Sequence, residues 1–211
     1  MKVYDLTLPF TIDMMVFPGT PPMSYKLSQT ITKDNYNLGI ASINTHAGTH
    51  TDAPLHFIKD GDSLEEIDVY KYIGKTVIVD CSVKSDFDKI YVSDLLPYSE
   101  KITDCKRVII KTGWSKHFNE PKYFTDYPVI TLELANWLVK LGILMIGVEP
   151  PSLNPKKYIE VHKALLSAGV VIVEGLTNLE TIPGNEIFFI GAPIALKGAD
   201  GFPLRALGIE F

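Results

Sequence analysis

The sequence has few cysteines, few arginines and no clustered basic residues, and each shortage excludes a class of protein. The two cysteines, Cys81 and Cys105, form no C-x-x-C pair, so we interpret them as reduced structural residues of a cytoplasmic protein. Arginine occurs only at positions 107 and 205, and the net charge is −5. Nucleic acids and anionic membranes select for clustered Lys and Arg, so neither is an expected partner. The lack of an arginine cluster also argues against a polyphosphate substrate.

Long apolar stretches are absent as well. No run reaches the roughly 18 apolar residues that a membrane-spanning helix needs. The N-terminal segment MKVYDLTLPF resembles a strand and lacks the apolar core and cleavage site of a signal peptide. We find no repeat or linker, and 211 residues suit one compact domain, so we expect residues 1–211 to form a single domain.

Strand-like patterns outnumber helical ones along the chain. Helical spacing of apolar residues covers residues 131–142 and 157–169. Thr131 is the expected N-cap of the first segment, and a glycine closes the C-terminal end of each segment. Strands are expected at residues 2–8, 23–29, 36–44, 75–81, 106–113, 143–148, 170–174, 186–196 and 202–211. Two strand–helix–strand passages in the second half therefore predict a mixed-sheet α/β domain.

The segment HAGTHTDAPLHF, residues 46–57, holds three of the five histidines in the chain. Its candidate metal-binding and catalytic residues are His46, His50, Asp52 and His56. Neutral imidazoles and carboxylates that converge on one point can bind a divalent cation. Gly48 and Pro54 disfavour a continuous helix, so we expect a tight loop that wraps His46, His50 and Asp52 around an ion. The competing interpretation is a group of ordinary surface histidines at the end of a strand.

A second pair of candidates lies more than a hundred residues away. His162 shares helical spacing with apolar residues and faces inward, which by itself is more typical of a core histidine than of a ligand. Glu174 ends the apolar strand VVIVE, where a carboxylate would be costly unless it is paired or metal-bound. A helix that returns directly into this strand could place the two side by side, and Asp52 could then bridge two ions. His117 lies in a polar loop with no nearby carboxylate, and we interpret it as structural or exposed.

These motifs resemble the cyclase family of metal-dependent hydrolases, which includes kynurenine formamidase and isatin hydrolase. HAGTHTDAPLHF matches all seven fixed positions of the family signature His-x-Gly-Thr-His-x-Asp-x-Pro-x-His. The segments FPGTPP, TGWSK, VHKALLSAGVVIVEGLTNL and GADGFPLRA are similar to further family segments, so the likeness covers the whole chain. Glu149, Asn154 and Gly175 depart from the family pattern, and they leave the exact substrate open.

The resemblance implies a swivelling β/β/α domain that assembles into homodimers or homotetramers. It implies that His46, His50 and Asp52 hold one Zn or Mn ion, and that Asp52, His162 and Glu174 hold a second. It assigns His56 as the catalytic acid/base and Phe17 to the substrate pocket.

The chemistry of such a site favours hydrolysis of a formamide or a cyclic amide, and the resemblance implies an aryl substrate of the N-formylkynurenine type. A divalent cation can provide hydroxide near neutral pH, and His56 can shuttle the proton to the leaving nitrogen. Phe17, and also Trp114, would suit an aryl group. Two alternatives stay open at this point: an Fe(II) oxygenase that uses His50, Asp52 and His162, and a non-catalytic metal-binding protein.

Overall fold

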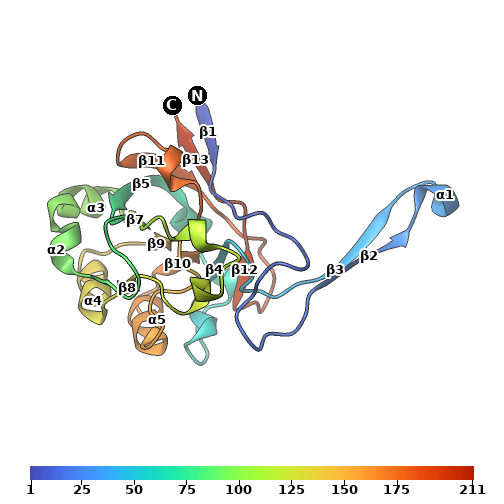
Figure 1. Ribbon diagram of the computed structural model, residues 1–211, viewed down its shortest axis with the longest axis horizontal. Coiled ribbons are helices and arrows are strands. Elements are labelled where there is room, and N and C mark those ends of the chain that lie inside the picture. Colours follow the sequence, from blue (N-terminus) through green and yellow to red (C-terminus); the bar gives the residue numbers. More distant parts are fainter.

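A nine-stranded mixed sheet forms the centre of the molecule, with strand order β1-β13-β11-β5-β7-β9-β10-β4-β12. The computed structural model describes residues 1–211 (Figure 1). The strands of this sheet are β1 (Lys2–Asp5), β4 (His50–Asp52), β5 (Ile73–Asp80), β7 (Arg107–Lys111), β9 (Met145–Val148), β10 (Val171–Glu174), β11 (Glu186–Ile190), β12 (Gly201–Pro203) and β13 (Leu207–Glu210). Two short pairs lie outside it, namely β2 (Ser24–Gln29) with β3 (Leu38–Ser42), and β6 (Lys89–Ile90) with β8 (Val129–Ile130).

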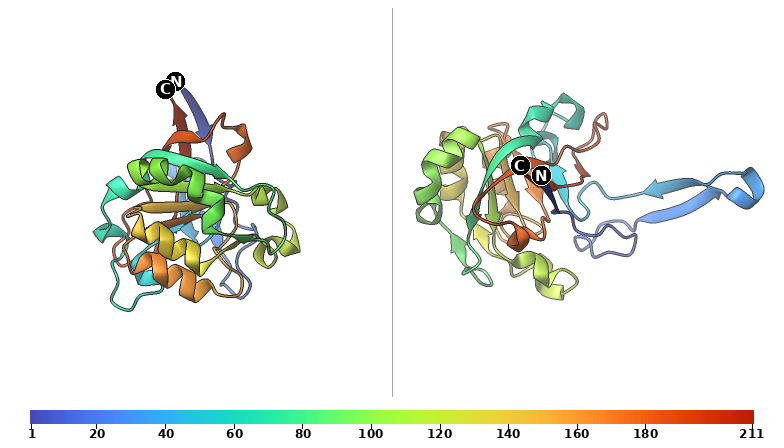
Figure 2. Two further views of the ribbon diagram at one scale, coloured as in Figure 1. Left: turned by 90° about the vertical axis from the view of Figure 1, so that its left-hand side faces the viewer. Right: turned by 90° about the horizontal axis from the view of Figure 1, so that it is seen from above.

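The helices connect the parallel strands β5, β7, β9 and β10, and they cover one face of the sheet (Figure 2). They are α2 (Val92–Leu95), α3 (Ser99–Cys105), α4 (Leu132–Lys140) and α5 (Tyr158–Leu166), and α1 (Ile31–Asp34) lies apart. Short 3-10 helices span Pro54–His56, Leu64–Glu66, Val69–Tyr72, Leu96–Tyr98, Trp114–His117, Pro121–Phe124 and Leu179–Thr181. Parallel neighbours require crossover connections, which explains why these helices gather on one face.

Two apolar cores hold the layers together. The larger one, 21 buried residues, fills the space between the helices and the sheet and includes Val108, Ile146 and Leu138. The second core contains 15 buried residues on the opposite face of the sheet, among them Phe189. Residues of the 176–182 segment belong to this core and cover that face. Because both faces of the central strands are buried, their sequences read as continuous runs of Val and Ile.

One element leaves the body of the molecule altogether. The hairpin β2–α1–β3 projects as a long arm in Figure 1 and in the right-hand view of Figure 2. Its strands expose large apolar side chains on both faces, including Tyr25 at 57%, Leu27 at 47% and Ile40 at 52%.

The predicted mixed-sheet α/β class is confirmed, and so are both main helices. Thr131 caps α4 by accepting a hydrogen bond from the backbone N–H of Leu134 at 3.2 Å. The expected strands at 2–8 and 186–196 end earlier, at Asp5 and Ile190. The strand expected over 202–211 is two strands, β12 and β13, which pair with different neighbours.

The prediction that residues 46–52 form only a loop is partly wrong. His46 lies in a turn, as expected, but His50–Asp52 is strand β4, inserted between β10 and β12. The sequence HTD carries no apolar alternation, so its strand conformation comes from pairing on both sides and not from local preference.

Candidate metal centre

Strand pairing brings Glu174 beside the histidine cluster. In the antiparallel register of β4 with β10, Glu174 lies directly opposite His50, and Ile172 lies opposite Asp52. Directly paired residues project to the same face, and residues two apart on one strand do so too. His50, Asp52 and Glu174 therefore share one face of the sheet, and all three are buried, with no more than 3% exposed.

The turn that carries His46 is fixed by close contact with the end of β10. The Thr49 hydroxyl donates to the carbonyl of Gly175 at 2.5 Å and accepts from the N–H of Leu8 at 2.8 Å. Gly175 has φ of +68°, and a Cβ there would lie 2.5 Å from the carbonyl oxygen of Gly48. Only glycine satisfies both conditions without strain. This departure from the family pattern therefore allows the His46 turn to dock against β10.

His162 reaches the same point from helix α5, on the face of the sheet that the helices cover. Its Nδ1 lies 2.6 Å from the carbonyl oxygen of Tyr158, and the Nδ1 of His50 lies 2.9 Å from that of Gly48. A carbonyl only accepts, so each Nδ1 carries the proton and donates. Each Nε2 is left as the atom that faces the site, as in histidines that bind metals.

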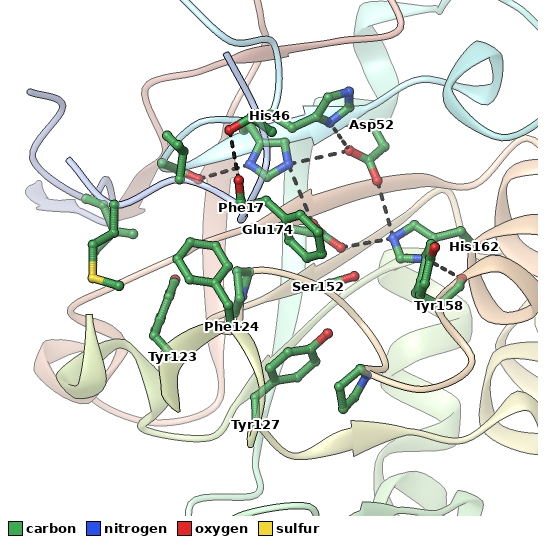
Figure 3. A pocket seen from close by; sticks show the side chains of 18 of the residues that line it. Phe17, His46, Asp52, Tyr123, Phe124, Tyr127, Ser152, Tyr158, His162 and Glu174 are labelled. Carbon is green, nitrogen blue, oxygen red and sulfur yellow. Dashed lines mark hydrogen bonds and ion pairs between the residues drawn. The ribbon is translucent and has the colours of Figure 1, made fainter. Parts of the chain in front are cut away.

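These Nε2 atoms meet carboxylate oxygens at distances that suit a shared cation (Figure 3). His50 Nε2 lies 3.5 Å from Asp52 Oδ1 and 3.5 Å from Glu174 Oε2. His162 Nε2 lies 3.4 Å from Asp52 Oδ2 and 3.1 Å from Glu174 Oε1. Two buried carboxylates that face nitrogen lone pairs repel one another unless a positive charge lies between them. The donor set of nitrogen and oxygen atoms therefore fits a divalent cation such as Zn²⁺ or Mn²⁺.

The pKa values of these groups reflect the same crowding of charge. Burial, together with the nearby charge of Asp52, raises the pKa of Glu174 to about 7. Burial lowers the pKa of His50 to about 4, so its imidazole is neutral. Burial would also lower the pKa of His46, but hydrogen bonds with Asp200 and Asp52 raise it to about 10. In the absence of a cation, protons thus supply part of the positive charge that the carboxylates require.

His56 lies at the edge of the donor set and not at its centre. It ends the 3-10 helix Pro54–His56, and its ring stacks on His46 with centroids 3.8 Å apart. Its Nδ1 lies 3.2 Å from Asp200 Oδ2, and the same oxygen is 2.9 Å from His46 Nε2. His46, Asp52 and His56 also offer ligand atoms within 4.8 Å of one another. His56 is therefore oriented by a carboxylate, and its side chain is 28% exposed, whereas the side chain of His50 is 4% exposed.

A cavity of about 390 Å³ opens beside these groups. Phe17 lines it, as predicted, and meets Phe124 edge to face with ring centroids 6.0 Å apart. Trp114 does not line it: its indole N–H donates to the carbonyl of Tyr123 at 3.1 Å, and the ring is buried. Phe17 and Phe124 are therefore part of the aromatic wall of the cavity, and Trp114 has a packing role.

The structure brings together every residue that the sequence analysis assigned as a metal ligand, as the acid/base or, for Phe17, to the substrate pocket. They are His46, His50, Asp52, His56, His162, Glu174 and Phe17. His117 lies outside the cavity, beside Trp114, and contrary to expectation has a carboxylate partner, Glu120, at 3.0 Å. Sequence reasoning missed Asp200, although it stands in the GADGFPLRA segment that resembles the family.

The two other departures from the family pattern have structural explanations. The Glu149 carboxylate accepts from the backbone N–H of Thr112 at 2.6 Å and from the hydroxyl of Ser115 at 3.0 Å. The Asn154 side chain donates to the carbonyl of Ile130 at 3.2 Å. Both residues are buried and hold loops, and neither lines the cavity.

Known proteins share this fold and this sequence pattern. Residues 4–155 match the family model "Cyclase: Putative cyclase". A kynurenine formamidase from Bacillus cytotoxicus is 32% identical over 206 residues, which cover 96% of this chain and 95% of that protein. A kynurenine formamidase from Bacillus cereus is 31% identical over 207 residues, which cover 96% and 95% of the two chains.

Solved structures agree on the fold. One described as a potential metal-dependent hydrolase with cyclase activity has a TM-score of 0.77 at 28% identity, and the match covers 98% of this chain and 96% of the other. Isatin hydrolase A from Labrenzia aggregata has a TM-score of 0.85 at 24% identity, with 98% and 93% covered. At that identity the second likeness shows the fold alone.

The kynurenine formamidase relatives, the metal-dependent hydrolase of the same fold and the buried histidine–carboxylate set together identify a metal-dependent amide hydrolase. The relatives therefore favour hydrolysis over the oxygenase and the non-catalytic binding protein. The chain belongs to the cyclase family. No helix of the structure has the length and apolar character that crossing a bilayer demands.

Proposed function

We propose that this enzyme is an arylformamidase, which hydrolyses an aryl formamide or a cyclic amide of the N-formylkynurenine type. One observation carries the proposal: the buried histidine–carboxylate set opens directly into an aromatic-walled cavity, with His56 at the junction. Relatives named kynurenine formamidase, 32% and 31% identical to this chain, support this substrate class.

The metal ligands we propose are His46, His50, Asp52, His162 and Glu174. The two oxygens of Asp52 face different histidines, His50 on one side and His162 on the other. Glu174 presents its two oxygens to the same two histidines. In this arrangement the histidines, Asp52 and Glu174 would hold one or two ions, Zn or Mn. When bound, such a cation lowers the pKa of a coordinated water and polarises a carbonyl.

The proton transfer is assigned to His56. Amide hydrolysis must deliver a proton to the leaving nitrogen, and a positioned imidazole is a common general acid for that step. Asp200 holds the Nδ1 side of the ring at 3.2 Å, which leaves Nε2 free to exchange a proton with substrate. Phe17 and Phe124 would bind the aryl ring of the substrate by edge-to-face or stacked contact.

Metal analysis and a substrate panel test this function. The protein, purified without chelator, should contain Zn or Mn, and it should hydrolyse at least one of formanilide, N-formylkynurenine and isatin. His50→Ala should lose metal and activity together, because it removes a ligand from the centre of the set. A metal-loaded enzyme that is inactive on all three substrates would refute the proposed activity.

We also propose that the enzyme is a homodimer or homotetramer, and that the β2–β3 arm makes the contact. Tyr25 and Leu27 pair with Ala41 and Gly39 on one face of the arm, and Ile40 lies on the other. An isolated two-stranded ribbon is at best marginally stable in water, so a ribbon that is apolar on both faces requires a partner. The body of the molecule exposes Ile194 and Leu196 (68% and 46%), and a second copy could cover such surface reciprocally.

Light scattering coupled to gel filtration tests the arm. The unmodified protein should elute as a dimer or tetramer, and Leu27→Lys combined with Ile40→Lys should convert it to a monomer. Ser28→Lys, on the same strand but polar to begin with, serves as the control and should leave the assembly intact. A monomeric unmodified protein at micromolar concentration would contradict the proposal.

Residues 1–211 would act as one domain in the cytoplasm. Both Cys81 and Cys105 are free thiols, which is the expected state in a reducing compartment.

A further inference from the structure

Outside the histidine–carboxylate set, the walls of the cavity carry no cationic side chain. Of its 21 lining residues, none is Lys or Arg. Its only acidic and imidazole side chains are those already described, His46, His50, Asp52, His56, His162 and Glu174. Away from this group the lining is apolar or neutral, as with Met15, Phe57 and Pro155.

The polar groups that remain are hydroxyls. Ser152, Tyr127 and Tyr158 line the cavity, and Figure 3 shows the Tyr127 hydroxyl directed towards Ser152. Burial raises the pKa of Tyr127 further above its usual range, so this side chain is a neutral donor at physiological pH. Such groups can bind a carbonyl or a ring substituent by hydrogen bonds, but they do not neutralise a carboxylate.

A charged substituent inside this space would therefore lose its hydration without gaining a counter-ion. Burial of an ionised group is costly unless the group is paired. An uncharged aryl ring meets the opposite situation, because Phe17 and Phe124 offer it apolar and edge-to-face contact. The difference between the two cases sets the selectivity of the site.

We infer that the site recognises aryl amides whose ring bears no charge, and that it has no binding group for an amino-acid side chain. This inference rests on the proposed amide hydrolase function and narrows its substrate class. A charged tail, such as the amino-acid end of N-formylkynurenine, must stay in solvent at the mouth of the cavity. The tail should then add nothing to recognition.

Two matched pairs of substrates test this inference with the metal-loaded enzyme. In the first pair, 4-formamidobenzoate carries a carboxylate on the ring and 4-formamidoacetophenone carries a neutral acetyl group of similar size. Each kcat/KM is normalised to the rate of alkaline hydrolysis, which corrects for the leaving group. We expect the neutral compound to be favoured by about tenfold or more, mainly through KM. A ratio above threefold supports the inference, and a ratio of threefold or less overturns it.

The second pair compares N-formylkynurenine with 2-formamidoacetophenone, which lacks only the amino-acid end. We expect the truncated compound to be hydrolysed with at least the same kcat/KM. If N-formylkynurenine is favoured more than threefold, the enzyme does recognise the charged end and the inference is wrong.

A cation placed on the wall provides an independent test. Thr20 lines the cavity and is exposed, so a lysine at this position can point inward without displacing core residues. Thr20→Lys should raise kcat/KM for 4-formamidobenzoate at least fivefold relative to Thr20→Met, which matches the length without the charge. Equal values for the two variants would count against the inference.

These experiments separate the inference from the proposed function. If no aryl amide is hydrolysed, the proposed function fails, and the same pairs are then compared by calorimetric binding to the metal-loaded protein. Tighter binding of the neutral members supports the inference, and equal or weaker binding overturns it.

Discussion

Replacement of His56 by alanine should separate proton transfer from metal binding. His56 stacks on His46 at 3.8 Å and is bonded to Asp200 at 3.2 Å, yet it is 28% exposed. His50, in contrast, is 4% exposed and faces both Asp52 and Glu174. We therefore expect His56→Ala to keep its full metal content, whereas His50→Ala should not.

The expected loss is in the chemical step. General acid catalysis by a positioned side chain contributes roughly 10²–10⁴ in rate, and the loss should appear mainly in kcat because the interaction matters most in the transition state. The carboxylate at 3.2 Å orients the ring, so Asp200→Asn should cause a smaller loss, roughly 10- to 100-fold.

Parallel assays on an anilide and on an activated ester make this prediction specific. A formate ester of a nitrophenol has a leaving group that needs no protonation, so His56→Ala should impair its hydrolysis much less than that of formanilide. His117→Ala is the matched control, since His117 lies outside the cavity beside Trp114. Loss of metal from the His56 variant would show that His56 is a ligand, and equal impairment on both substrates would refute its role as proton donor.

Three further predictions concern the metal centre and its support. Glu174→Gln should lower metal stoichiometry measured by elemental analysis and leave the far-UV circular dichroism spectrum unchanged; full occupancy would contradict its role as a ligand. Metal affinity should rise from pH 6 to pH 8, because the pKa of Glu174 is raised to about 7 and that of His46 to about 10 in the metal-free protein, and a cation must displace their protons. Competition with a chromophoric chelator measures this affinity, and an affinity independent of pH would refute the prediction. Gly175→Ala should lower the melting temperature by roughly 4–8 °C, equivalent to about 2 kcal/mol, because its Cβ would lie 2.5 Å from Gly48 O. Gly184→Ala, with φ of +76° and no atom within 4 Å, should cost less, and equal losses would show that the contact with Gly48 is unimportant.

The helices and the central strands were predictable because their signals are local. Thr131 and Gly142 mark the ends of α4 through capping chemistry that involves only neighbouring residues. The buried strands β9 and β10 are continuous apolar runs, which is the expected pattern when both faces are covered. The short strand β4 could not be predicted in this way, since its three residues are polar or charged and obtain their conformation from β10 and β12.

The sequence by itself determined which residue types could form a metal centre, because His46, His50, Asp52 and His56 lie within eleven residues and their ligand chemistry is intrinsic. Only the tertiary structure decided how the distant Glu174 joins them.

Glu174 reaches His50 through a strand register that spans more than a hundred residues, and Asp200 reaches His56 across 144 residues. The lack of Lys and Arg in the cavity wall is likewise a property of the fold, since the wall combines side chains from separate loops and helices. Such long-range proximity depends on the packing of the whole sheet, and no local pattern in the sequence encodes it.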